Sequence, residues 1–228
     1  MDNNIILKAE DLVKKYGNDE NAVFALDHVN FCANKGEFVA VTGESGSGKT
    51  TLLNIIGTID TPDSGSLTVN GEQLIGKKDD ALSAYRRKNI GFIFQNYNLI
   101  PVLNVEENIL LPLNLDSSKP DMEYLEELLE LTGLSKKRYN FPHQLSGGQK
   151  QRVAFVRALI GKPQIILADE PTGNLDSKNS KEIMTILKTS IRKYDQSLIL
   201  VTHDPGIAAQ ADRITVMNDG VLTERTVN

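Results

Sequence analysis

The sequence predicts an α/β fold in which helices cover a parallel sheet, with an antiparallel β portion and an inserted helical segment. Three observations support this fold class. Strand-like runs alternate along the chain with stretches of helical periodicity, which is typical of parallel sheets. Asn-Gly and Asp-Gly pairs separate other strand-like stretches, as they do in β-hairpins. The middle third of the chain is instead dominated by helical spacing of apolar residues.

Three apolar runs are expected to form buried parallel strands, namely Phe38–Thr42, Ile165–Ala168 and Leu198–Val201. Runs of this length that are almost entirely apolar suit strands covered on both faces. A helix is expected over residues 49–56, directly after the first run and a glycine-rich loop. Apolar residues at helical spacing from Ile183 to Tyr194 predict another helix between the last two strands.

The hairpin signals and the change of character in the middle of the chain predict its organisation. Asn70-Gly71 and Asp219-Gly220 are expected to form turns of an antiparallel sheet. Residues 96–157 are predicted to be a mostly helical insertion. The core is then formed by residues 1–95 and 158–228, all within a single domain.

Two helices are predicted inside this insertion. The first lies within Pro120–Leu134, with Pro120 near its start and Gly133 as its C-cap. Phe141-Pro142 then breaks the chain, and the second helix is expected to run from Gln149 to Ile160.

Composition and charge exclude several classes of protein. The 228 residues carry a net charge of −5, with both signs mixed along the chain, which argues against nucleic acid as the main partner. No run approaches the roughly 20 apolar residues of a membrane span, and residues 1–4 lack the features of a signal peptide. We therefore expect a cytoplasmic chain that reaches a membrane only through a partner. Cys32, the single cysteine, is expected to be a small buried residue.

A glycine-rich loop follows the first predicted strand and precedes the first predicted helix. It reads Gly43-Glu44-Ser45-Gly46-Ser47-Gly48-Lys49-Thr50 and matches the phosphate-loop pattern G-x-x-x-x-G-K-[ST]. Such a loop turns backbone N–H groups and a helix N-terminus toward nucleotide phosphates. We expect Lys49 to contact the β- and γ-phosphates, Thr50 to bind Mg²⁺, and Thr51 to belong to the same site. The loop alone does not distinguish kinases, GTPases, helicases and transporters.

Two carboxylates, Asp169 and Glu170, end the apolar run Ile165–Ala168. In phosphate-loop enzymes a carboxylate at such a strand end supports Mg²⁺, and Asp169 is predicted to take that role. Glu170 is predicted to polarise the attacking water as a general base. The alternative is a pair of solvated charges, but the buried run and the upstream phosphate loop favour the catalytic interpretation.

Leu145-Ser146-Gly147-Gly148-Gln149 resembles the signature motif of ATP-binding cassette (ABC) proteins. Other motifs of that family occur in the expected order. Tyr16 matches the aromatic residue that stacks on adenine, Gln95 the glutamine loop, Asp176 in Asn174-Leu175-Asp176 the conserved-aspartate loop, and His203 the switch histidine. The resemblance covers essentially the whole chain. It implies a RecA-like phosphate-loop ATPase core with an antiparallel β subdomain and an inserted helical subdomain.

The resemblance also implies a reaction and its partners. Two copies pair head to tail, and the signature residues Ser146, Gly147, Gly148 and Gln149 contact ATP bound to the other copy. His203 is implied to hydrogen-bond the γ-phosphate, and Gln95 to sense Mg²⁺ and the attacking water. The expected reaction is hydrolysis of MgATP coupled to a membrane permease. A simpler interpretation of Tyr16, as a residue that closes a turn, stays open.

The permease of such proteins docks near the glutamine loop, which here corresponds to residues 96–103 followed by 109–112. Both segments are apolar for an exposed position, although ordinary packing within the insertion explains them equally well. His28 and His143 are expected to be structural.

The sequences of residues 171–177 and 96–101 resemble those of one branch of the family. That branch contains macrolide exporters, lipoprotein-release systems and antimicrobial-peptide resistance transporters. Glu44-Ser45 departs from the Pro-Ser that is commoner in that branch. Two other functions remain as alternatives: an ABC ATPase that acts on another cytoplasmic machine, and a nucleotide-binding regulator.

Overall fold

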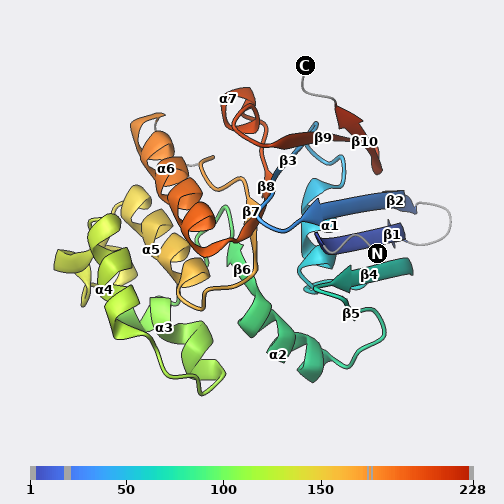
Figure 1. Ribbon diagram of the computed structural model, residues 1–228. Helices are drawn as coiled ribbons and strands as arrows, with labels where there is room; N and C mark the ends of the chain where they lie inside the picture. Colours follow the sequence, from blue (N-terminus) through green and yellow to red (C-terminus); the bar gives the residue numbers. More distant parts are fainter. Residues whose placement is uncertain (1–3, 18–21, 174, 176, 226–228) are drawn as a thin grey trace. The chain divides into compact units, whose positions relative to one another are not determined.

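The computed structural model describes residues 4–17, 22–173, 175 and 177–225, and its elements are shown in Figure 1. The chain divides into two compact units. The first comprises Met1–Ser83 with Ser197–Asn228, and the second comprises Ala84–Gln196. The predicted insertion at residues 96–157 falls inside the second unit, where the chain forms helices and turns but no strand. The exact borders of that insertion stay a prediction.

An antiparallel sheet forms one part of the first unit. Its strands are β1 (Ile5–Tyr16), β2 (Val23–Asn34), β4 (Ser64–Val69) and β5 (Glu72–Gln73), in the order β2-β1-β4-β5. The hairpin signals predicted such a sheet, but the two long strands β1 and β2 were not among the predicted elements. Their pairing is interrupted by register shifts, which break the strict alternation that marks a strand in the sequence.

The other strands of the first unit surround the phosphate loop. β3 (Phe38–Thr42) pairs in parallel with β8 (Ser197–Val201) and with β9 (Arg213–Asn218), and β9 pairs antiparallel with β10 (Val221–Arg225). Every residue of β8, and every residue of β3 except Thr42, is buried. The short helix α7 (Pro205–Ala208) follows β8, and α1 (Lys49–Ile56) follows the loop after β3.

The two predicted hairpin turns are confirmed. Asn70 and Gly71 lie between β4 and β5 with φ values of 51° and 77°. Asp219 and Gly220 lie between β9 and β10 with φ values of 45° and 79°. Positive φ at both central residues is the requirement of a type I′ turn, which explains why these residue pairs occur there.

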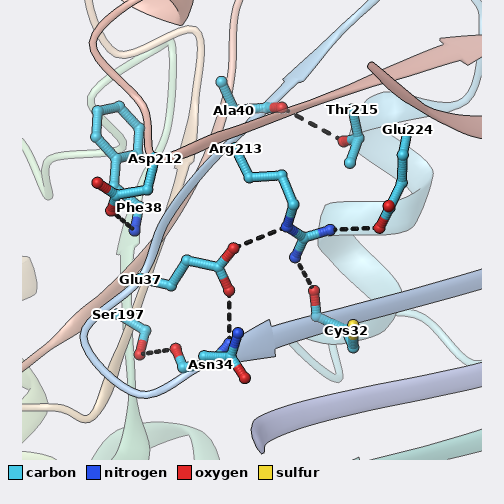
Figure 2. Close-up of polar contacts among 10 residues, drawn as sticks. All are labelled: Cys32, Asn34, Glu37, Phe38, Ala40, Ser197, Asp212, Arg213, Thr215 and Glu224. Carbon is cyan, nitrogen blue, oxygen red and sulfur yellow. Dashed lines mark hydrogen bonds and ion pairs between the residues drawn. The ribbon is translucent and has the colours of Figure 1, made fainter. Parts of the chain in front are cut away.

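Arg213 on β9 contacts β10, β2 and the turn before β3 (Figure 2). Its guanidinium donates to Glu37 Oε1 at 2.7 Å, to Glu224 Oε1 at 2.9 Å and to the Cys32 carbonyl oxygen. The other carboxylate oxygen of Glu37 accepts from the Asn34 amide at 2.7 Å. One side chain on β9 therefore holds β10, the end of β2 and the turn into β3.

The second unit contains a parallel strand pair and most of the helices. β6 (Ile90–Ile93) pairs in parallel with β7 (Ile165–Asp169). The helices are α3 (Val105–Leu115), α4 (Met122–Leu131), α5 (Gly147–Leu159) and α6 (Ser177–Tyr194), with short 3-10 turns η1 (Ser135–Lys137) and η2 (Pro142–Gln144). The helix α2 (Asp79–Asn89) contains the boundary between the units. Val153, Val156 and Leu159 recur at helical spacing on α5 and are all buried.

The first helix predicted in the insertion is confirmed: α4 lies within Pro120–Leu134, Asp121 next to Pro120 is its N-cap, and Gly133 with φ 64° follows its last turn. Two other sequence-based expectations need correction. α5 begins at Gly147 rather than Gln149, because Ser146 caps it. Cys32 is exposed rather than buried. It alternates on β2 with Phe31 and Ala33, which face the core, so its own side chain is on the solvent face.

Within the part of the chain that the structure describes, no helix combines the length and the apolar character needed to cross a bilayer.

Candidate active site

The phosphate loop connects β3 to α1, and its shape depends on glycine. Gly43 and Gly48 adopt φ values of 143° and 108°, which favour glycine. A Cβ atom on Gly43 would lie 2.1 Å from the carbonyl oxygen of Met217. A Cβ on Gly48 would lie 2.1 Å from the carbonyl oxygen of Ala25. The loop therefore packs directly against the backbone of β9 and β2.

Lys49 is buried at the start of α1, and its ammonium group points back into the loop. Nζ donates to the carbonyl oxygens of Gly43 at 3.0 Å and Glu44 at 2.5 Å, and to Ser47 Oγ at 3.3 Å. Ser47 is itself buried, and its carbonyl oxygen accepts from the Gly220 amide at 3.0 Å. The positive charge is thus held inside the loop, as phosphate binding requires.

The remaining loop residues form the accessible rim. Glu44, Ser45, Gly46 and Thr50 are exposed, and Thr51 is half-buried on α1. A Cβ on Gly46 would meet no atom within 4 Å. The residues predicted to bind the nucleotide from this loop are therefore open to a ligand, while Lys49 anchors them from inside.

Tyr16 lies at the end of β1 in a small polar network. Its hydroxyl donates to Asp60 Oδ2 at 2.6 Å, and Lys14 Nζ donates to Asp60 Oδ1 at 2.9 Å. Burial alone would raise the pKa of Asp60, but the hydrogen bonds from Tyr16 and Lys14 outweigh it and lower the pKa below its ordinary value. The Tyr16 side chain is tethered at its hydroxyl and remains 46% exposed, so it retains surface for stacking.

His203 lies just after β8, on the same sheet edge as the phosphate loop. β3 and β8 are parallel neighbours with Val41 opposite Val201, and the carboxyl ends of parallel strands meet at one edge. Thr202 is fully buried, and its Oγ1 accepts from the Asp204 amide at 3.0 Å. This arrangement leaves the imidazole exposed beside the loop. The first unit therefore brings together the loop and His203.

The second unit brings together the other predicted catalytic groups. Ile93 of β6 lies opposite Ala168 of β7, so Gln95 and the Asp169-Glu170 pair follow the ends of neighbouring parallel strands. Gln95 Nε2 lies 3.5 Å from the position that a Cβ on Gly173 would take. The glutamine side chain thus reaches the segment that follows the two carboxylates.

Glu170 has a backbone conformation that the sequence did not reveal. Its φ is 45°, in the left-handed region that non-glycine residues rarely adopt. Its carbonyl oxygen accepts from the Gly173 amide at 3.1 Å, which closes a tight turn directly after β7. Such backbone strain is common at functional sites, and here it falls on the predicted general base.

The signature motif forms the beginning of α5. Ser146 Oγ accepts from the Gln149 amide at 3.3 Å, and Gln149 Oε1 accepts from the Ser146 amide at 3.0 Å. This reciprocal capping box was readable as S-x-x-Q but was missed. Gly147 and Gly148 consequently lie in the first helical turn, where backbone N–H groups have no partner within the helix. The predicted role of Asp176 concerns a residue outside the described part of the chain.

These motifs define a phosphate-loop nucleotide-binding protein. The sequence model of the ABC transporter family matches residues 26–173, and the chain belongs to that family. It is an ATPase of the ABC type, with the predicted α/β fold of a RecA-like core with an antiparallel β portion.

Named relatives support this assignment. The chain is 46% identical over 200 residues to the ABC transporter ATP-binding protein YxdL of Bacillus subtilis, which covers 87% of this chain and 78% of the relative. It is 42% identical over 219 residues to the lipoprotein-releasing system ATP-binding protein LolD of Cytophaga hutchinsonii, covering 95% and 98%. It is 44% identical over 224 residues to the macrolide export ATP-binding/permease protein MacB of Mannheimia succiniciproducens, covering 97% of this chain but 34% of that relative.

A solved structure of an ATP-binding cassette is also similar to this chain. The ATP-binding cassette MJ0796, described as the dimeric structure of a post-hydrolysis state bound to ADP and Pi, matches with a TM-score of 0.89 and 39% sequence identity. The match covers 97% of this chain and 100% of that one.

Proposed function

We propose that two copies of this chain pair head to tail around ATP and power a membrane permease that exports or removes antimicrobial peptides, antibiotics or lipophilic compounds. The observation that carries this proposal is the 39% identity and TM-score of 0.89 to a dimeric cassette bound to ADP and Pi. Relatives named for macrolide export and lipoprotein release support the transport role. The chain then works at the cytoplasmic face of the membrane through the permease.

Each candidate residue of the two units takes a separate role in the proposed hydrolysis. Lys49 and the loop amides bind the β- and γ-phosphates, and Tyr16 stacks on adenine. Glu170 accepts a proton from the attacking water, while Gln95 and His203 hold the water and the γ-phosphate in line.

Mg²⁺ fits the donors that this chain offers. Thr50 supplies a hydroxyl, Asp169 a carboxylate and Gln95 an amide oxygen. Mg²⁺ takes oxygen ligands and is usually bound through one or two carboxylates together with substrate phosphates and waters, so one carboxylate and two neutral oxygen donors suit it. When bound, the ion would neutralise charge on the β- and γ-phosphates.

The signature residues support an action on a second copy. The Ser146 and Gly147 positions are exposed at the N-terminus of α5. The Gly147 and Gly148 N–H groups in the first helical turn and the helix dipole favour an anion such as a γ-phosphate. Gln149 has its side chain in the capping box, so we propose that it supports the motif rather than donating its side chain to ATP.

The segment proposed to meet the permease is narrower than the sequence suggested. Asn108 is fully buried and hydrogen-bonds the backbone of Ile100 in both directions, at 2.7 and 3.1 Å. Val102 on the same rigid loop is 78% exposed, whereas Ile109 is completely buried. We therefore assign docking to the exposed apolar side chains of residues 100–102 and internal packing to Ile109.

The test is a pull-down with the Glu170→Gln variant from detergent-solubilised native membranes in MgATP, read by mass spectrometry. We expect this variant to bind ATP without hydrolysing it, to elute as a dimer, and to retain a multi-span permease. Adding Val102→Asp should abolish permease recovery while leaving the dimer intact. Recovery of soluble partners alone would refute the transport role and favour an ATPase of another cytoplasmic machine.

A further inference from the structure

Arg157 on α5 holds the chain segment that follows the glutamine loop. Its guanidinium donates to the carbonyl oxygen of Tyr97 at 2.7 Å and to that of Asn98 at 2.6 Å. Burial lowers the pKa of Arg157, and the two acceptors that it contacts are neutral backbone carbonyl groups. Burying a cation costs desolvation free energy. We therefore ask what its two contacts with carbonyl groups contribute to the protein.

The segment that Arg157 holds is strained. Tyr97 and Asn98 are consecutive non-glycine residues with φ values of 55° and 46°. The left-handed conformation is unfavourable for such residues, and it persists only where neighbouring groups impose it. The Asn98 amide donates to the Asn96 carbonyl at 2.5 Å, and the Tyr97 amide donates to that of Phe94 at 3.2 Å. Arg157 binds the two carbonyl groups that this tight turn directs away from its own backbone.

The same turn also reaches the signature end of α5. The Tyr97 hydroxyl lies 3.3 Å from the position that a Cβ on Gly147 would take. Gly147 and Arg157 are separated along the helix by about 15 Å at 1.5 Å per residue. Helical side chains lean toward the N-terminus, so Arg157 reaches back along α5 and Tyr97 covers the remaining distance. The Tyr97 backbone is therefore held by Arg157, and its hydroxyl lies beside Gly147 at the start of the same helix.

We propose that Arg157 and Tyr97 are positioning residues that fasten the segment after Gln95 to the signature helix, so that glutamine loop and signature motif move as one piece. We call Arg157, Tyr97 and Asn98 the Arg157 clamp. The clamp touches neither nucleotide nor water, and its effect on hydrolysis rests on the roles proposed above for Gln95 and Ser146. Its consequence is that displacement of the glutamine loop is transmitted directly to the residues that meet the second ATP.

The first test measures kcat, KM and ATP affinity of the full chain. We expect Arg157→Gln to lower kcat about tenfold while ATP affinity changes less than about twofold, because the phosphate loop is untouched. Arg157→Lys should be intermediate, since it keeps the charge but loses the planar fork. Arg192→Gln, at an exposed arginine on α6, is the matched control and should leave kcat unchanged.

A double-mutant cycle shows whether the clamp acts through Gln95. In a Gln95→Ala background, Arg157→Gln should lower kcat by less than about twofold, because the group it positions is already gone. A full additional tenfold loss would overturn the clamp as a positioning device. If Gln95→Ala alone leaves kcat unchanged, the proposed role of Gln95 fails instead.

Hydrogen exchange then tests the clamp without reference to catalysis. Arg157→Gln should accelerate amide exchange about tenfold in both residues 96–100 and residues 147–150, with the phosphate loop unchanged. Unchanged exchange in both segments would overturn the proposal. If Arg157→Gln does not fold, Arg157→Lys and Tyr97→Phe are measured in the same way, and the same outcomes decide.

Discussion

Asp60 connects Tyr16, the tyrosine predicted to stack on adenine, to the segment that follows α1. It accepts hydrogen bonds from Tyr16 and Lys14 and lies four positions beyond the end of α1. The Lys14 side chain is mostly buried beside it. Nothing in the local sequence pattern indicated these contacts, because Tyr16 and Asp60 are 44 positions apart.

We predict a pH-dependent loss of stability in Asp60→Asn. The folded pKa of Asp60 is depressed, so its contribution is present above the unfolded pKa of about 3.9 and is lost as pH falls through the folded pKa. Urea unfolding should show the variant less stable than the wild type at pH 7, with the difference shrinking toward pH 3. A difference in the free energy of unfolding that is equal at both pH values would contradict the role of the Asp60 charge.

At the scale of elements, the strands of the first unit depend on a few polar contacts. Burial lowers the pKa of Arg213, but the hydrogen bond to Glu37 outweighs this and raises it, so the guanidinium stays charged in the folded state. Asp212 Oδ2 also accepts from the Phe38 amide at 2.9 Å, and Ser197 Oγ donates to the Asn34 carbonyl oxygen at 3.0 Å (Figure 2). Together these contacts set how β3, β8, β9 and the end of β2 meet.

We predict that Arg213→Met destabilises the protein by about 2–4 kcal/mol, because it leaves the mostly buried Glu37 carboxylate unpaired. Lys8→Met is the matched control, since Lys8 pairs with Glu10 where both side chains are half-exposed. Such surface pairs contribute about 0–1 kcal/mol. Chemical denaturation of both variants measures the two effects. Equal losses would show that Arg213 acts only through its aliphatic packing.

At the scale of the whole molecule, assembly depends on a residue with two separable tasks. Ser146 caps α5 within one chain, and we propose that it meets the γ-phosphate bound to the other chain. Capping needs only a short polar side chain, whereas contact with a phosphate excludes a negative charge. Substitutions can therefore separate helix stability from dimer formation.

We predict that three Ser146 variants, made in the Glu170→Gln background, differ in stability and in ATP-dependent dimer formation. Ser146→Ala should lose about 1 kcal/mol of stability because the cap is removed. Ser146→Asp should keep the cap but fail to dimerise in MgATP, whereas Ser146→Asn should keep both properties to a measurable degree. Thermal unfolding and light scattering with size-exclusion chromatography distinguish these cases. A normal ATP-dependent dimer with Ser146→Asp would contradict the proposed contact across the interface.

Much of the fold and most of the site were predictable from local patterns. The strand Phe38–Thr42 and the helix Lys49–Ile56 occur with the predicted boundaries, because continuous apolar runs and a phosphate loop leave few alternatives. The start of α5 was misplaced because glycine is a poor helix former, and the capping box that overrides it was not weighed. Cys32 was misjudged because burial in a strand depends on which face is covered, not on residue type.

By itself, the sequence determined the family, the order of the catalytic motifs and the type I′ turns, because each depends on residues adjacent in the chain or on backbone preferences of individual residues. Only the tertiary structure decided the tether of Tyr16 to Asp60, the strained placement of Glu170 and the hold of Arg157 on the turn after Gln95. These features join residues far apart in sequence or backbone conformations that the residue type disfavours. Tertiary contacts, including long-range hydrogen bonds, supply the free energy that selects them.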